Sequence, residues 1–176
     1  GEGCFAPARA LAHLARYIRA CKMCTTLASR DGAYTLQMAL TAPGPYAANV
    51  RHRPRLLSDN GPSYVSAELG RWLHDHNMAH TRGRPYHPMT QGKIERWHRS
   101  LKNQILLENY YLPGELEQRI ANFVEYYNVQ RYHESLDNVT PEAVYFGQAS
   151  AIITRRQAIK RKTLEHRRRQ YQNALA

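Results

Sequence analysis

The sequence predicts an α/β fold, because segments patterned as strands and segments patterned as helices follow one another along the chain. Short apolar runs that end at Gly, Pro, Asn or Asp favour strands, and apolar residues spaced three and four apart favour helices. The chain has 176 residues, of which 43% are hydrophobic, which is enough for one domain with a core. We therefore expect a single α/β domain followed by a tail.

The first half of the chain contains two expected strands and a helix. Residues 17–24 mix β-compatible and polar side chains and favour a strand, whereas residues 31–40 have a loose helical spacing that stops before Pro43-Gly44-Pro45. Residues 54–59 form a short apolar run that ends at the turn signal Asp59-Asn60-Gly61-Pro62. Asp59 is therefore expected at the carboxyl end of a strand.

A helix, a short strand and two further helices are expected next. Ser66 is a suitable N-cap for a helix whose inward face is Leu69, Trp72 and Leu73, and residues 78–81 follow as a short strand. A long helix is predicted from Gly92, with an apolar stripe made of Ile94, Trp97, Leu101 and Ile105. Another helix begins at Pro113, and the residues that it is expected to bury are Leu116, Ile120, Phe123, Val124 and Tyr127.

Positive charge is concentrated at the C-terminal end. The formal net charge is +11, and residues 149–176 contain many lysines and arginines but a single acid, Glu165. Such a tail attracts polyanions, of which nucleic acid is the commonest inside cells, and the alternative is a solvated, partly helical tail without a specific partner. No apolar stretch reaches the roughly 18 residues that span a bilayer, so we expect a soluble intracellular protein without a membrane partner.

Cysteine and histidine spacing does not predict a metal site. Three cysteines are too few for a disulfide framework and indicate a reducing compartment, and Cys21 and Cys24 are interpreted as small apolar residues of a strand. Of the clustered histidines, only His76 and His80 have i, i+4 spacing, and a predicted break separates them. We interpret these histidines as polar surface residues: His74, His76, His80 and His87.

Two carboxylates are candidates for chemistry. Asp59 is expected at a strand end, where α/β sheets place their sites, and Glu95 in the first turn of a helix. If the two carboxylates converge, they can hold a pair of divalent cations. One cation activates the attacking oxygen and the other stabilises the leaving oxygen of a phosphodiester. Taken separately, each acid also has an ordinary structural explanation. Asp59 begins a turn, where Asp is favoured, and Glu95 lies near a helix start, where an acid is stabilised by the helix dipole.

Several motifs resemble a known family. Residues 57–61 (LSDNG) and 86–98 (YHPMTQGKIERWH) look like signatures of the integrase catalytic core. Residues 99–103, 126–128, 131–136 and 141–147 further resemble DDE-type transposases of two-frame bacterial insertion sequences. The resemblance covers roughly residues 17–147.

The resemblance implies a ribonuclease-H-like fold, with a mixed five-stranded sheet flanked by helices, and phosphodiester cleavage and strand transfer on DNA ends and target DNA. It matches Asp59 with the second acid of the Asp, Asp, Glu triad and Glu95 with the third, and implies Mg²⁺ or Mn²⁺ bound by both. It also implies a cytoplasmic, nucleoid-associated bacterial protein. Resemblance and basic charge together indicate the following DNA-binding residues: Tyr86, His87, Gln91, Lys93, Arg96, His98, Lys102, Arg155, Arg156, Lys160 and Arg161.

The family's first Asp has no match in this sequence. Residues 1–16 contain a single acid, Glu2, in unlike surroundings, so we interpret 1–16 as an atypical segment, 17–147 as a partial core and 148–176 as a basic tail. We expect the first strand or strands to be missing or altered, with unpaired strand edges, marginal folding or self-association as a homo-oligomer. We also expect negligible cleavage by this chain alone.

Two other functions remain open at this point. The first is a catalytically inactive remnant that only binds nucleic acid. The second is an RNA-binding protein, which is disfavoured because the tyrosines fall mainly in expected helices and loops rather than on an exposed sheet. Trp97 could stack on a base, but its place in the apolar stripe favours the core, and we expect Trp72 in the core as well.

Overall fold

The computed structural model describes residues 6–12, 14–24, 29–42, 55–83, 92–105, 107 and 112–174. Within them, no helix has the length and apolar character that a membrane span requires. The strands and helices, in chain order, are β1 (Ala6–Ala12), β2 (Tyr17–Cys24), α1 (Ser29–Thr41), β3 (Leu56–Ser58), η1 (Pro62–Tyr64), α2 (Ala67–Asp75), β4 (His80–Arg82), α3 (Gly92–Ile105), α4 (Pro113–Glu125), η3 (Tyr126–Gln130), η4 (Glu134–Leu136), α5 (Pro141–Tyr145) and α6 (Ala149–Ala174).

The first two strands form an antiparallel hairpin. Ala6 pairs with Cys24 and Ala12 with Tyr17, and the register shifts between Ala10 and Leu11. The strand predicted at residues 17–24 is confirmed, with Cys21 and Cys24 in it. Strand β1 was not predicted, because its alanines and arginine have little intrinsic strand preference and only pairing with β2 holds this segment extended.

The other two strands form a separate parallel pair, with Leu56 opposite His80 and Ser58 opposite Arg82. Each is shorter than its prediction, but Asp59 follows β3 directly, as expected. In the described part of the chain, β1–β2 and β3–β4 are not hydrogen-bonded to each other. The described strands therefore make two small sheets instead of the single five-stranded sheet that the resemblance implied.

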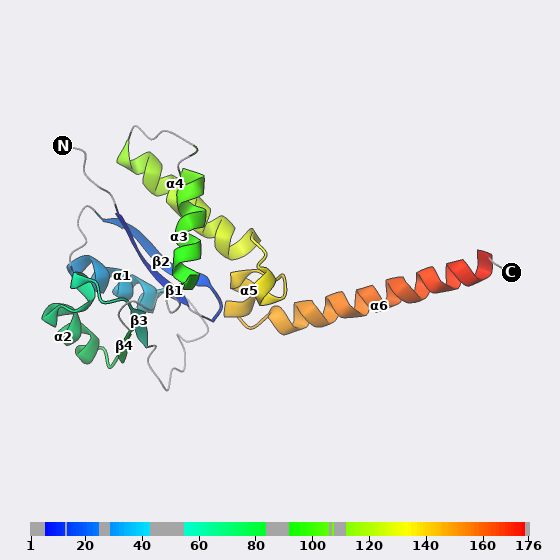
Figure 1. Ribbon diagram of the computed structural model, residues 1–176, viewed down its shortest axis with the longest axis horizontal. Helices are drawn as coiled ribbons and strands as arrows, with labels where there is room; N and C mark the ends of the chain where they lie inside the picture. The colour runs from blue at the N-terminus through cyan, green and yellow to red at the C-terminus, as the bar shows by residue number, and fades with distance from the viewer. Residues whose placement is uncertain are drawn as a thin grey trace.

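The larger core lies between the β1–β2 hairpin and the helices α3 and α4, which cross it (Figure 1). Trp97 is 1% exposed, which confirms its expected place in the core. The helix predicted from Gly92 is confirmed, and its apolar stripe packs against the hairpin and α4. The buried residues of this core are Ile18, Trp97, Leu101, Ile120, Phe123 and Tyr127.

A second, smaller core forms under α2. Ser66 caps this helix as predicted, since its hydroxyl accepts a hydrogen bond of 3.2 Å from the Leu69 amide. Leu69 and Leu73 pack against Met78, and Trp72 covers the edge of this core, where it is only partly buried. Helix α1 contacts both the hairpin and α2, so it connects the two cores.

The helix that begins at Pro113 continues past Glu125 as one π-helical turn, η3. This turn places the side chain of Asn128, which is 5% exposed, against β2. Asn128 accepts a hydrogen bond of 2.9 Å from the Ile18 amide and donates one of 3.0 Å to the Ile18 carbonyl. The side chain thus satisfies both backbone groups of a buried strand residue, as a neighbouring strand would.

The basic tail is a 26-residue helix, α6, that projects away from the rest of the chain (Figure 1). None of its residues is buried. Its first turns are fastened by Arg156, which donates a hydrogen bond of 2.6 Å to the Asn138 carbonyl and lies 5.4 Å from the Tyr132 ring centre. The rest of the helix is exposed along its length.

Candidate metal and nucleic-acid site

Asp59 is exposed at the carboxyl end of β3 and its side chain is held by the turn that follows. One carboxylate oxygen, Oδ1, accepts a hydrogen bond of 2.9 Å from the Gly61 amide. A Cβ at position 61 would lie 3.0 Å from that oxygen, so a side chain there would push the carboxylate outward by a few tenths of an ångström. The turn therefore orients the Asp59 carboxylate.

The backbone around Asp59 is tied to the end of β4. The Gly83 amide donates to the Ser58 carbonyl at 2.8 Å, and the Asn60 side chain donates to the Gly83 carbonyl at 2.9 Å. The Ser58 hydroxyl donates to the Asp59 carbonyl at 2.8 Å and lies 2.8 Å from Nε2 of His80, which is therefore the donor in that contact.

Burial lowers the pKa of His80, and the positive charge of Arg82 lowers it further, so the ring is neutral near pH 7. A neutral ring with its proton on Nε2 matches the contact with Ser58. Sequence reasoning missed Ser58, Asn60 and His80 as positioning residues, because their partners lie about twenty residues away in the chain.

Glu95 lies in the first turn of α3 and is exposed. At about 100° per residue, Glu95, His98 and Lys102 share one flank of the helix, on one side of the buried Trp97 and Leu101 face. Lys93 and Arg96 lie on the opposite flank. The basic residues expected around Glu95 therefore divide into two surfaces.

The flank with Lys93 and Arg96 meets the β1–β2 turn. Burial lowers the pKa of Lys93, and the positive charges of Arg16 and Arg96 lower it further. Arg16 is in the left-handed region, with φ of 57°. The sequence contained no signal for Arg16, because only the folded hairpin brings it to α3.

Tyr127, below this surface, is 2% exposed. Burial raises the pKa of its hydroxyl, and the nearby Arg16, Arg131 and Arg96 oppose that rise. His133 packs edge-on against Tyr127, with ring centroids 4.9 Å apart. Burial, with Arg131 and Arg16, lowers the pKa of His133 to about 4, so its ring is neutral near pH 7.

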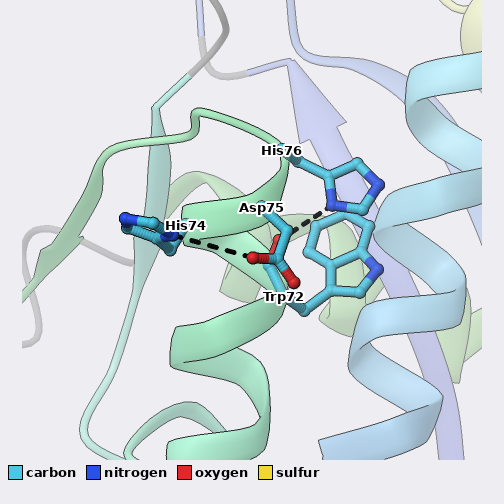
Figure 2. Close-up of polar contacts among 4 residues, drawn as sticks. All are labelled: Trp72, His74, Asp75 and His76. Carbon is cyan, nitrogen blue, oxygen red and sulfur yellow. Dashed lines mark hydrogen bonds and ion pairs between the residues drawn. The ribbon is translucent and has the colours of Figure 1, made fainter.

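The histidines at the end of α2 contact protein groups in ways typical of surface residues. Figure 2 shows His74 and His76 pointing to different sides of the helix end. Nδ1 of His74 lies 3.6 Å from the Asp75 carboxylate, and the His76 ring stacks on Trp72 with Nδ1 donating to the Trp72 carbonyl at 2.8 Å. In the part of the chain that the structure describes, no three His, Cys, Asp or Glu side chains are grouped to hold a metal ion.

The remaining candidate residues lie elsewhere. Tyr86, His87 and Gln91 fall outside the described residues. On α6, Arg156 contacts the body of the chain, whereas three further basic candidates extend along the exposed helix: Arg155, Lys160 and Arg161.

Comparison with known proteins connects this geometry to a family. Residues 76–141, which include Glu95 but not Asp59, match the family model described as "Integrase core domain". The catalytic core domain of BIV integrase has the same fold, with a TM-score of 0.61 and 19% identity over 85% of this chain and 90% of that chain. Residues 76–141 are therefore similar to the integrase core family, and the chain has the fold of retroviral integrase catalytic cores.

Other relatives of the integrase core are also retroviral. The HTLV-2 integrase catalytic core domain, solved in complex with magnesium in a trimeric form, has a TM-score of 0.56 at 15% identity, covering 80% of this chain and 93% of that chain. The Pol-related polyprotein of mouse intracisternal A-particle MIA14 is 39% identical over 67 residues, 38% of this chain. The chain spans only 8% of that polyprotein. The narrower likeness to bacterial insertion-sequence transposases stays a prediction.

Proposed function

We propose that this integrase core acts in DNA integration, with Asp59 and Glu95 as the acids that bind a divalent cation. The observation that carries the proposal is the presentation of Asp59, whose exposed carboxylate is oriented by the Gly61 amide at the carboxyl end of β3. Strand ends are where α/β folds place their sites. The match of residues 76–141 to the integrase core family supports the assignment of Glu95.

The donor chemistry of the two carboxylates fits Mg²⁺ or Mn²⁺. Hard cations prefer oxygen ligands, and Mg²⁺ is commonly held by one or two carboxylates together with water and substrate phosphate. When bound, such an ion supplies charge stabilisation for the attacking and leaving oxygens of a phosphodiester. The protein's own part is to orient Asp59 through Gly61, to place Glu95 at the start of α3, and to attract DNA with its basic residues.

The proposed substrates are the ends of an integrating DNA element and its target DNA, joined when a 3′ hydroxyl of the element attacks a target phosphodiester and displaces the target's own 3′ oxygen. We propose self-association as part of this activity, since the HTLV-2 core was solved as a trimer. The exposed basic residues of α6 would add contacts to the DNA backbone.

Metal binding tests the proposal without requiring activity. Mn²⁺ added to isotopically labelled protein should broaden the NMR signals of residues next to both Asp59 and Glu95. Asp59→Asn and Glu95→Gln should each weaken the broadening at both positions, whereas Glu117→Gln, an exposed acid of α4, should have no effect. Broadening at only one of the two acids, or at neither, would refute a shared site.

A second candidate function is nucleic-acid binding without catalysis. The observation that favours it is the exposed basic helix α6, which can attract a polyanion without any metal ion. Under this alternative, the chain binds duplex DNA but gives no Mg²⁺-dependent nicking. Nicking that depends on Mg²⁺ and is abolished by Glu95→Gln would exclude it.

A further inference from the structure

Three segments that are far apart in the sequence meet at the buried side chain of Tyr127, and each brings an arginine. Arg16, from the β1–β2 turn, is close enough to act electrostatically on the Tyr127 hydroxyl. The guanidinium carbon of Arg131 lies 5.7 Å from the centre of the Tyr127 ring. Arg96, from α3, is close enough to act on the same hydroxyl electrostatically. We call Arg16, Arg96 and Arg131 the arginine cluster.

The arginine cluster has no acidic counterpart in the described part of the chain. Among the described residues, none of the three arginines has a carboxylate within salt-bridge distance. His74 and Asp75, which do form an ion pair, belong to α2. Arg96 instead folds back, with Nε donating at 3.0 Å to the carbonyl of Gly92 in its own helix. The mutual repulsion of the three charges is therefore left without a carboxylate to offset it.

His133 completes the same surface. Its ring packs on Tyr127, and its buried Nε2 has no hydrogen-bond partner among the described residues. Both charged groups that act on this ring, Arg131 and Arg16, are cations. Arg16, Arg131 and His133 are each only partly buried, so parts of these side chains face solvent, whereas Nε2 of His133 itself is buried. An anion at this position would relieve the repulsion and accept a hydrogen bond from each guanidinium.

We propose that the arginine cluster binds a backbone phosphate of nucleic acid, at a position separate from the Asp59 and Glu95 carboxylates. Guanidinium groups suit this ligand because their planar N–H pairs match phosphate oxygens. Arg96 projects from α3 about 100° around the helix axis from Glu95, so the arginine cluster and the Glu95 carboxylate lie on different faces of this helix. The inference rests on the proposed function in one respect, which is that the partner is DNA.

Charge removal with a matched control tests this subsite. The double variant Arg16→Gln with Arg131→Gln is compared with Arg30→Gln with Arg71→Gln, which removes two exposed arginines from α1 and α2. Binding of a labelled duplex is measured in EDTA across a salt series. The cluster variant should bind about tenfold or more weakly at 0.1 M salt, and the slope of log K against log salt should fall by about 1, the loss of one phosphate contact. Equal weakening in both variants, or an unchanged slope, would overturn the proposal.

A measurement on the unaltered chain covers the case in which the cluster variant does not fold. The ring signals of His133, assigned with His133→Gln, should titrate at a higher pH when duplex is bound, because a phosphate offsets the two neighbouring cations. An unchanged titration would count against the site. Inorganic phosphate is titrated as a comparison. If it saturates the shift of the His133 signals below about 1 mM while duplex has no effect, the site binds a free anion and not a DNA phosphate.

The same experiments separate this inference from the proposed function. If the unaltered chain binds no duplex, DNA is lost as the partner for both. If it binds duplex and the cluster variant binds equally well, only the subsite is refuted. Since EDTA removes divalent ions, neither result depends on metal at Asp59 and Glu95.

Discussion

Replacing Asn128 with leucine should destabilise the fold more than any change of similar size on the surface. Asn128→Leu keeps the branched shape of the side chain, with bulkier methyl groups in place of the amide, and removes the hydrogen bonds of 2.9 and 3.0 Å to the amide and carbonyl of Ile18. Both residues are buried, at 5% and 2% exposure, so water does not replace the lost bonds. Each orphaned backbone group costs about 1 to 3 kcal/mol, so the loss of both should lower the free energy of unfolding by about 2 to 6 kcal/mol.

The assay is urea unfolding followed by circular dichroism and tryptophan fluorescence, since Trp97 lies in the same core as Ile18. Asn122→Leu is the matched control, because Asn122 uses its amide in an exposed side-chain hydrogen bond with Gln118 and should lose less than about 0.5 kcal/mol. If the two variants unfold within about 0.5 kcal/mol of each other, the bridging role of Asn128 is refuted.

Three further predictions concern pH, a helix cap and the tail. Because the pKa of His133 is about 4 in the fold and 6.5 when unperturbed, the unfolded chain takes up the proton first, so the free energy of unfolding should fall between pH 6.5 and 4. The ring is partly exposed, so this loss of stability should be about 1 to 2 kcal/mol. Urea melts at pH 7 and 4.5 measure it. His133→Gln should reduce the difference between the two pH values, whereas His74→Gln, at an exposed site, should not. Ser66→Ala should cost about 0.5 to 2 kcal/mol in the same melts by removing the cap on α2, and an unchanged midpoint would contradict the cap. Deleting the residues after Ala149 should leave the melting temperature nearly unchanged, because α6 buries no residue, while it lowers DNA affinity and its salt dependence; equal affinity would show that the tail is a solvated helix without a DNA role.

Local patterns in the sequence were enough to predict the elements whose conformation is determined by their own residues. The apolar stripe of α3 and the Ser66 cap of α2 were both expected and are both present. Strand β1 was not, because its alanines carry no pattern and pairing with β2 orders it. The π-helical turn of η3 was also missed, because the need to place Asn128 opposite Ile18 arises only once β2 is in position.

The candidate site shows the same division. Asp59 was expected at a strand end and Glu95 at a helix start, and both lie there, since each position follows from adjacent residues. The support for Asp59 from His80 and the meeting of Arg16 with Arg131 depend on chain segments that fold together from a distance. No spacing along the sequence encodes those contacts.

If the chain binds duplex DNA as proposed, the length of α6 sets how much of that duplex the protein can cover. A 26-residue helix at 1.5 Å per residue is a rod of about 39 Å, slightly longer than one turn of B-form DNA, which is about 34 Å. Its attachment at Arg156 leaves the far end free to follow a groove or backbone one turn away from the globular part. The footprint on DNA should therefore be lopsided, with protection extending further on the side that the rod faces, and the direction of that extension would report how the protein is oriented on its substrate.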